Sequence, residues 1–237
     1  MTEFLFRQDA YLQSAEAVVI DITPEGGIVL DRTVFYATSG GQPGDVGRLM
    51  RADGSTLAVA TAIHPDGDKS RIVHVPADTN LQLEPGETVR AEIDWDRRHR
   101  LMRMHTALHL LSVVFPFPVT GGSIGEDKGR LDFDMPEAPD DLPILEAQIN
   151  AMIDADHAVT DEWITDAEME AKLDLIKTMK VKPPMGQGRV RLVRIGEVDL
   201  QPCGGTHVAG TAEIGRVALG KIEKKGKQNR RVNLLFA

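Results

Sequence analysis

The sequence predicts an α+β protein in two parts: a small β-barrel over residues 1–94 and an α+β domain over residues 95–237. In the first part, short apolar runs alternate with turn residues, a pattern typical of small barrels and sandwiches. In the second part, a long run with helical periodicity precedes further helices and strands, which favours helices packed on an antiparallel sheet. The chain has 237 residues, of which 42% are hydrophobic, so a core of normal size can form.

Turn signals separate the predicted strands of the first part. A strand at Ala17–Ile22 is expected to pair with Ile28–Leu30 across a turn rich in Gly and Pro. Asp53-Gly54 predicts a hairpin between Arg48–Met50 and Thr56–Val59, because Asp-Gly favours tight two-residue turns. Several such strands in succession support a barrel or a sandwich.

One loop, Ser39–Gly47, stands out because four of its nine residues are glycine. Glycine can adopt positive φ and lets a backbone approach its neighbours closely. A surface loop between strands is the ordinary interpretation, and a loop that lies over a metal site or a substrate phosphate is the sharper one. It is not a nucleotide-binding P-loop, because it lacks the Gly-Lys-Ser/Thr ending and a strand–loop–helix context.

A long helix is predicted to open the second part and to end near Phe115. Asp94 or Asp96 is a suitable N-cap, and two prolines beyond Phe115 prevent continuation. His105 and His109 lie at the edge of its buried face, where a rigidly held side chain can still reach a cleft. Apolar residues at spacings of three and four define that face: Leu101, Met104, Leu108 and Leu111.

Periodicity and caps predict the remaining elements of the second part. Helices are expected at 140–157 and from a Thr165–Glu168 capping box through Ile176. A turn is expected at Thr120–Ile124. Strands are expected at 130–133, 190–195, 213–223 and 229–236, the last two forming a hairpin.

His105 and His109 form one half of a candidate metal site. Residues four apart share one face of a helix, so both imidazoles can aim at one ion. Cys203 and His207, on a glycine-rich loop, form the other half. Each half alone is a weak signal, because helical histidines are common and a buried cysteine is usually a small apolar filler. Together they supply three nitrogens and one sulfur, a zinc-type ligand set.

The chain contains one cysteine, so no internal disulfide forms and the thiol is available as a ligand. This fits a reducing cytoplasm, and no secretory signal is expected. The longest apolar run, 110–119, is too short to cross a bilayer, so no membrane partner is expected. Thr106 stands where the peptidase pattern His-Glu-x-x-His has its glutamate, which counts against a zinc peptidase.

The formal net charge of −9 argues against broad, non-specific nucleic-acid binding, which depends on neutralising phosphates. Basic residues nevertheless cluster at two places, and a local phosphate-binding surface is one interpretation of them. A solvated hairpin tip is the alternative for the larger cluster. The clusters are Arg97, Arg98, Arg100 and Arg103 before the histidine pair, and Lys221, Lys224, Lys225, Lys227, Arg230 and Arg231 near the C-terminus.

Four motifs, in order along the chain, resemble the AlaX family, the free-standing relatives of the alanyl-tRNA synthetase editing domain. They are Phe35–Gly47, Arg103–Leu111, Gly129–Phe133 and Cys203–His207. The resemblance is to the medium-length members, in which a barrel precedes the editing domain. It implies a zinc-containing editing domain over 95–237, similar to the second additional domain of threonyl- and alanyl-tRNA synthetases, and a role in translation.

The resemblance implies a trans-acting aminoacyl-tRNA deacylase for tRNA(Ala) mischarged with serine and, in some members, with glycine. Thr120 is implied as the residue that senses the serine hydroxyl, and Gln42 as a substrate-facing residue of the glycine-rich loop. Many synthetase editing domains have Thr before the second histidine, and this chain departs from them with Leu108. The family pattern assigns the zinc to His105, His109, Cys203 and His207.

The sequence leaves two other functions open. Four protein ligands are typical of structural zinc, whereas catalytic zinc usually keeps one position open. A non-catalytic, zinc-stabilised module that binds tRNA is therefore the main alternative to an esterase. A zinc hydrolase of small amides or peptides is the third function, and the missing glutamate weighs against it.

Overall fold

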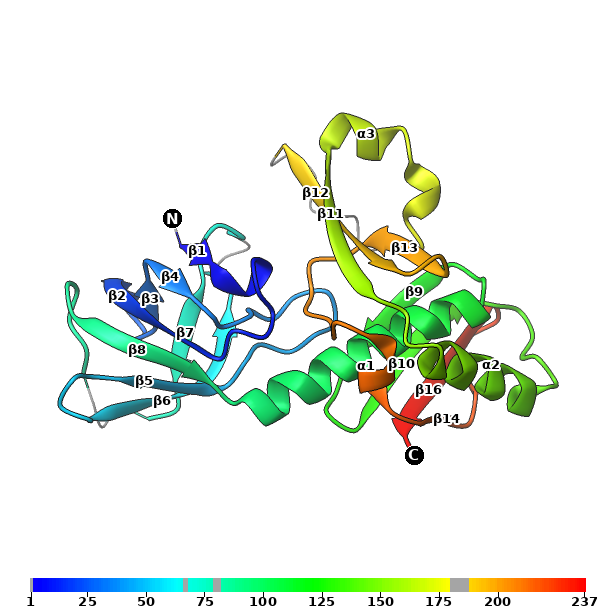
Figure 1. Ribbon diagram of the computed structural model, residues 1–237, viewed down its shortest axis with the longest axis horizontal. Helices are drawn as coiled ribbons and strands as arrows, with labels where there is room; N and C mark the ends of the chain where they lie inside the picture. The colour runs from blue at the N-terminus through cyan, green and yellow to red at the C-terminus, as the bar shows by residue number, and fades with distance from the viewer. Residues whose placement is uncertain (1, 66–67, 79–81, 180–187) are drawn as a thin grey trace. The chain divides into compact units, whose positions relative to one another are not determined.

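The computed structural model describes residues 2–65, 68–78, 82–179 and 188–237 of the chain (Figure 1). It divides into two compact units, Met1–His99 and Arg100–Ala237, and the division falls inside the long helix α1 (Trp95–Val114). The first unit holds a closed β-barrel, and the second combines helices with antiparallel sheets, which confirms the predicted α+β class. Among these described residues, no helix is both long and apolar enough to span a membrane.

The barrel of the first unit closes, over the described residues, in the order β2-β3-β7-β6-β5-β8, with antiparallel neighbours. The β5–β6 hairpin turns at Asp53-Gly54 as predicted, with Gly54 at a φ of +86°. A short strand pair, β1 (Glu3–Phe4) with β4 (Arg32–Thr33), and helix η1 (Leu5–Arg7) also belong to this unit. The barrel strands are β2 (Ser14–Ile22), β3 (Ile28–Leu30), β5 (Gly47–Met50), β6 (Thr56–Ile63), β7 (Val73–Pro76) and β8 (Thr88–Ile93).

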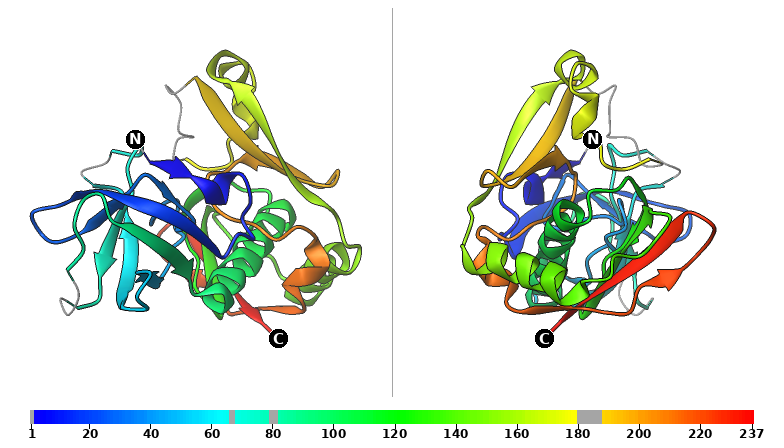
Figure 2. Two further views of the ribbon diagram at one scale, coloured as in Figure 1. Left: turned by 60° about the vertical axis from the view of Figure 1, so that its left-hand side comes forward. Right: turned by 90° about the vertical axis from the view of Figure 1, so that its right-hand side faces the viewer.

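The second unit is built on an antiparallel sheet in the order β14-β16-β10-β9, with β15 also paired to β16. Helices α1 and α2 (Leu142–Asp154) lie on one face of this sheet (Figure 2). Gly129 lets α1 approach closely, because a Cβ there would lie 2.8 Å from the Met104 side chain. The strands are β9 (Val119–Ser123), β10 (Lys128–Asp134), β14 (Val217–Leu219), β15 (Glu223–Lys224) and β16 (Asn229–Phe236).

A separate three-stranded antiparallel sheet, in the order β11-β12-β13, delivers the chain to the loop that contains Cys203. Its own small core gathers around Met169, Val190 and Leu192. The strands are β11 (Val159–Thr165), β12 (Arg189–Ile195) and β13 (Asp199–Pro202), and the short helices nearby are α3 (Asp166–Glu170), η3 (Leu173–Leu175) and η4 (Thr211–Ile214).

Three expectations for the second unit need correction. Residues 119–123 form strand β9 and not a turn, because Gly121 and Gly122 pair in register with β10. The third helix begins at the predicted Thr165–Glu168 capping box but ends at Glu170, and the chain beyond it turns Ile176 toward the small core of the three-stranded sheet. Residues 211–214 are helix η4, so the C-terminal hairpin starts later than expected.

Candidate metal centre

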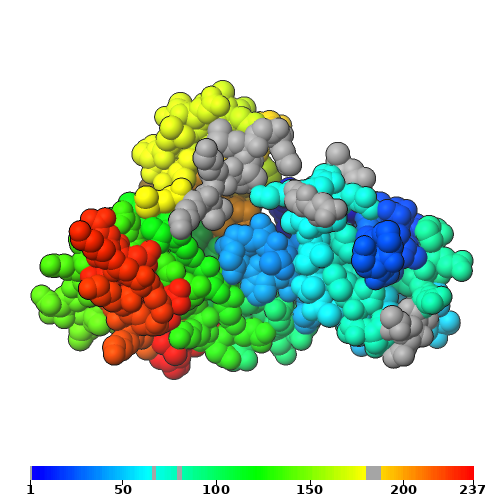
Figure 3. Space-filling view, turned by 180° about the vertical axis from the view of Figure 1, so that it is seen from behind, coloured from blue at the N-terminus to red at the C-terminus, as the bar shows by residue number. Residues whose placement is uncertain are grey.

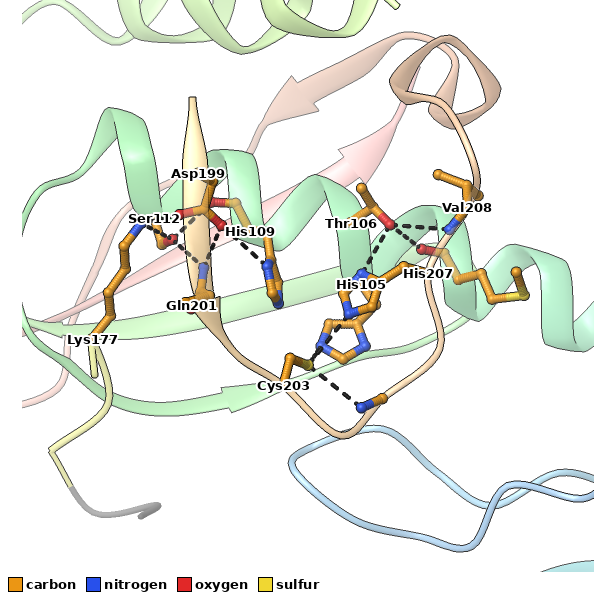
Figure 4. Close-up of polar contacts among 12 residues, drawn as sticks. His105, Thr106, His109, Ser112, Lys177, Asp199, Gln201, Cys203, His207 and Val208 are labelled. Carbon is orange, nitrogen blue, oxygen red and sulfur yellow. Dashed lines mark hydrogen bonds and ion pairs between the residues drawn. The ribbon is translucent and has the colours of Figure 1, made fainter. Parts of the chain in front are cut away.

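Helix α1 and the loop after β13 bring four ligand-type side chains together. The donor atoms of His105, His109, Cys203 and His207 all lie within 4.8 Å of one another. Figure 4 shows the two helix imidazoles facing the thiol and the imidazole of the loop. The three histidines are 6–7% exposed, so the cluster is held inside the second unit. The structure therefore brings together the four residues that the sequence singled out.

The spacing within this cluster suits a tetrahedral zinc ion. Zinc at ~2.3 Å from sulfur and ~2.0 Å from nitrogen places the sulfur about 3.5 Å from each nitrogen. The Cys203 Sγ lies 3.5 Å from His105 Nε2 and 3.3 Å from His207 Nε2. Three imidazoles and one thiol also form a donor set that binds zinc in preference to calcium or magnesium.

His207 is fixed by a buried hydroxyl of α1. The Thr106 Oγ1 lies 3.1 Å from His207 Nδ1, and the same oxygen accepts a hydrogen bond from Val208 N. Thr106 itself donates to Met102 O, one turn earlier in the helix. The ring of His207 therefore turns its Nε2 toward Cys203.

His109 is fixed by a buried carboxylate. Its Nδ1 lies 3.2 Å from Asp199 Oδ2, and the Asp199 side chain is 1% exposed. Lys177 donates to the other carboxylate oxygen at 2.5 Å and to Ser112 Oγ. Gln201 donates to Asp199 Oδ2 at 2.7 Å (Figure 4). A carboxylate on the second nitrogen of a ligating histidine is a common device for orienting the ring.

The ligand loop is held from the side of β12. Arg191 donates from one guanidinium nitrogen to Cys203 O at 3.2 Å and to Gly205 O at 2.9 Å. Within the loop, Gly205 N donates to Cys203 Sγ at 3.4 Å. These contacts fix the backbone that aims the thiol at the helix histidines.

The charges in the cluster favour a thiolate. Burial raises the pKa of the Cys203 thiol, but the charge of His105 and hydrogen bonds from His105 and His109 outweigh burial and hold that pKa well below its usual value. Burial and the charge of His105 together lower the pKa of His207 well below its usual value. Burial also opposes a charge on His109, yet hydrogen bonds to Asp199 and Cys203 raise its pKa to about 9. A metal cation would supply this positive charge beside the thiolate in place of a proton.

Thr120, the implied serine sensor, lies in the half-buried part of β9. Its hydroxyl donates to Asp132 O at 3.0 Å and accepts from Asn229 Nδ2 at 2.7 Å. No hydrogen bond among the described residues joins Thr120 to the four-residue cluster. Its role as a serine sensor stays a prediction.

Gln42, the implied substrate-facing residue, closes a tight turn in the first unit. Its backbone exchanges two hydrogen bonds with Ser39, across Gly40 and Gly41. Both glycines have positive φ, +58° and +85°, which a two-residue hairpin turn of this kind requires. The conformation of the turn therefore explains why glycine stands at positions 40 and 41. The role of Gln42 toward a substrate stays a prediction.

The prediction that Arg98 belongs to a phosphate-binding surface is wrong, because Arg98 is buried. Its side chain is fully buried in the first unit, where it forms a two-pronged ion pair with Asp45 and donates to Val34 O. Asp45 in turn accepts from Tyr36 N, so the pair ties α1 to the segment after the glycine-rich turn. Arg98 is therefore a structural residue of this unit.

The other predicted basic residues differ in how far acids neutralise them. Arg100 pairs with Asp127, Lys225 with Glu223, and Arg231 with Asp132. Arg97 and Arg230 donate to backbone carbonyls of Gly44 and Pro136. Lys221, Lys224 and Lys227 are exposed in the C-terminal hairpin, which is red in the space-filling view of Figure 3. These three lysines are therefore the main candidates for a phosphate-binding role, which stays a prediction.

Sequence reasoning missed the residues that orient the ligands. Asp199 and Gln201 precede Cys203 at spacings of two, so on a strand all three project to one side. That alternation was a usable signal for Asp199, but β13 is only four residues long and was not predicted. Thr106 was noticed only as the residue that replaces a glutamate. Lys177 and Arg191 carried no local signal.

The fold is that of a tRNA-synthetase-type accessory domain joined to a barrel. The family model described as "Threonyl and Alanyl tRNA synthetase second additional domain" matches residues 190–233, and that described as "tRNA synthetases class II (A)" matches residues 8–97. The chain is 40% identical to "Alanyl-tRNA editing protein AlaX-M" of Methanosarcina acetivorans, over 98% of each chain. A relative of the same name from Saccharolobus solfataricus is 35% identical over 98% of each chain. The chain belongs to this AlaX family of alanyl-tRNA editing proteins.

The same stretch also occurs inside much larger proteins. An "Alanine--tRNA ligase" of Streptococcus thermophilus is 34% identical over 98% of this chain, which spans 28% of that ligase. An "Alanyl-tRNA editing protein AlaX-L" of Pyrococcus horikoshii is 33% identical, and 56% of its length is covered. The sequence of both units thus matches relatives of similar length and parts of longer proteins.

Proposed function

We propose that this protein is a zinc-dependent aminoacyl-tRNA deacylase that edits tRNA(Ala), hydrolysing Ser-tRNA(Ala) first and Gly-tRNA(Ala) second. The observation that carries the proposal is the gathering of His105, His109, Cys203 and His207 into one buried cluster, in a chain that matches an AlaX-M relative over 98% of its length. Family names supply the substrate class, and the cluster supplies a place for the chemistry. The exposure of Lys221, Lys224 and Lys227 supports a phosphate contact with the tRNA.

The cluster fits zinc in distance and in donor chemistry. Zinc in such a site can acidify water and polarise an ester carbonyl. The protein's own part is to hold the ligands: Thr106 orients His207, Asp199 orients His109, and Arg191 fixes the loop backbone at the carbonyls of Cys203 and Gly205. Arg97 and Arg100 belong to the proposed tRNA contact, as do Lys225, Arg230 and Arg231, with part of their charge already used within the protein.

Selection of serine over alanine requires a polar contact that alanine cannot make. We assign this contact to Thr120. Its hydroxyl proton is used on Asp132 O and one lone pair on Asn229, which leaves one lone pair to accept from a serine hydroxyl. A site built around such a hydrogen bond can reject a substrate that lacks it. Gln42 is assigned to substrate contact on the family pattern alone, since its side chain is fully buried in the structure.

Thr120→Val tests this assignment directly. The valine keeps the shape of the side chain and removes the accepting oxygen. We expect slower hydrolysis of Ser-tRNA(Ala) with an unchanged zinc content. Unchanged kinetics on the serine ester would remove Thr120 from the site.

A non-catalytic tRNA-binding module is the second candidate, because four protein ligands are typical of structural zinc. The decisive experiment measures hydrolysis of Ser-tRNA(Ala), with Ala-tRNA(Ala) as the control substrate, before and after removal of metal by a chelator. We expect turnover of the serine ester that is lost with the metal and restored by added zinc. Binding of tRNA without turnover in the zinc-loaded protein would favour the binding module and reject the deacylase.

A further inference from the structure

Thr106 uses its whole hydrogen-bonding capacity at the junction of α1 and the ligand loop. A hydroxyl has one proton to donate and two lone pairs that accept. The proton goes to Met102 O at 3.0 Å, and one lone pair accepts from Val208 N at 3.3 Å. The second lone pair faces His207 Nδ1 at 3.1 Å.

This arrangement decides which nitrogen of His207 carries the proton. The short contact between Thr106 Oγ1 and the Met102 carbonyl needs the hydroxyl proton between the two oxygens. His207 Nδ1 must then be the donor in its contact with Thr106, because the hydroxyl has no second proton. The lone pair of the neutral ring is left on Nε2, the atom 3.3 Å from Cys203 Sγ. A ligating imidazole needs its lone pair there.

Thr106 cannot act on a substrate directly. The residue is fully buried, and its side chain reaches both the helix backbone and the loop backbone. It stands between the two helix ligands in sequence, and it binds the residue on either side of the 207–208 peptide bond. The hydroxyl is therefore placed to set both the ring of His207 and the position of the loop.

We propose that Thr106 is a positioning residue, which selects the Nε2-ligating form of His207 and docks the Cys203–His207 loop on α1. The inference rests on the metal site of the proposed function. It differs from the role of Asp199, because a neutral hydroxyl fixes the ring without placing a second negative charge beside the thiolate.

The test compares three purified variants loaded with zinc. Thr106→Val removes the hydroxyl and keeps the branched shape, and Thr106→Ser keeps the hydroxyl and removes the methyl. Thr211→Val is the matched control, because Thr211 is also fully buried but bonds to Met152, Ile153 and His157. We expect zinc affinity, measured by competition with a chelator, to fall ~10–100-fold in Thr106→Val. Thr106→Ser and Thr211→Val should stay close to the unmodified protein.

A spectroscopic measurement on the unmodified protein makes the test independent of folding. Long-range ¹H–¹⁵N NMR correlation on the zinc-loaded chain should show His207 with its proton on Nδ1. A proton on Nε2, or equal zinc affinity of Thr106→Val and Thr211→Val, would overturn the inference. Failure of the unmodified chain to bind zinc would instead reject the proposed function, so the two failures are distinguishable.

Discussion

His109 and His207 reach the same cluster, but different partners fix the two rings. A buried carboxylate holds His109, and that carboxylate is itself bound by Lys177 and Gln201. Burial raises the pKa of Asp199, but His109 and Lys177 outweigh it and lower that pKa to about 2. Asp199 is therefore charged at neutral pH, and its charge is balanced inside the protein by Lys177.

Asp199→Asn should weaken metal binding. The amide has nearly the same shape, but it cannot balance Lys177 and holds the His109 ring less strongly. Loss of such an orienting carboxylate typically costs ~10–100-fold in metal affinity. Chelator competition measures this loss, and Glu162→Gln is the control because it neutralises a carboxylate of the same sheet in an exposed pair with Arg194. Equal zinc affinities in the two variants would show that Asp199 does not orient the site.

Cys203→Ala should abolish both zinc binding and deacylation. The change removes the only sulfur of the cluster, and no second cysteine exists in the chain to replace it. Zinc per chain, measured by atomic spectroscopy, should fall far below one equivalent, and hydrolysis of Ser-tRNA(Ala) should be lost. If the variant hydrolyses the ester at the unmodified rate, the metal proposal fails.

The sequence predicted the four ligands because their spacing carries the information. His105 and His109 follow the helical repeat, and Cys203 and His207 share one loop. The orienting residues could not be predicted in the same way. Thr106 is recognisable only when His207 is known to lie opposite it, and Lys177 reaches Asp199 across 22 positions of the chain.

At the level of elements, the first turn of α1 is held within the first unit by a buried ion pair. Arg98, on the first turn of the helix, meets Asp45, which lies just after the glycine-rich turn. Both side chains are at most 1% exposed, so neither charge is compensated by water. The pair therefore fixes the course of the segment between β4 and β5.

Asp45→Ala should destabilise the first unit strongly. Removing one partner of a buried ion pair leaves the other charge uncompensated and typically costs about 3–5 kcal/mol. Glu92→Ala is the matched control, because Glu92 pairs with Arg48 at an exposed position and such pairs contribute about 0–1 kcal/mol. Urea unfolding can be followed by Trp95 fluorescence in a Trp163→Phe background, since these are the two tryptophans of the chain. Similar losses in the two variants would contradict the structural role of Asp45.

Elements with a strong local signal were predicted well, and elements made by tertiary pairing were not. The long helix and the Asp53-Gly54 hairpin were predicted because an apolar repeat and a turn dipeptide define them locally. Strand β9 contains two adjacent glycines, and β11 exposes most of its residues, so neither shows a strand pattern. Both exist because neighbouring strands supply their hydrogen bonds.

The stability of the whole molecule depends on a buried histidine that is unrelated to the metal centre. This histidine, His74, lies in the first unit. His74 donates from Nδ1 to Ile28 O, and its Nε2 accepts from the Thr33 hydroxyl, which itself accepts from Phe35 N. Burial lowers the pKa of His74 to about 4, against 6.5 for the free side chain. The folded chain therefore keeps this ring neutral where an unfolded chain takes up a proton.

Stability should consequently fall as the pH drops from about 6.5 to about 4. Above this window the ring is neutral in both states, and within it only the unfolded state gains a proton. A difference of this size corresponds to about 3 kcal/mol at about 1.4 kcal/mol for each pH unit. Unfolding free energies at several pH values measure it, and His74→Gln should remove this part of the slope. His64→Gln, with His74 intact, should keep the slope, and an identical slope in all three proteins would contradict the prediction.

The four ligands of the metal centre come from two different layers of the second unit. Two belong to α1, which packs on the larger sheet, and two follow β13 of the three-stranded sheet. An ion bound by both pairs of ligands would cross-link those two layers. Slower hydrogen exchange along β13 would then accompany metal uptake, because a bound ion would restrain local opening of both layers.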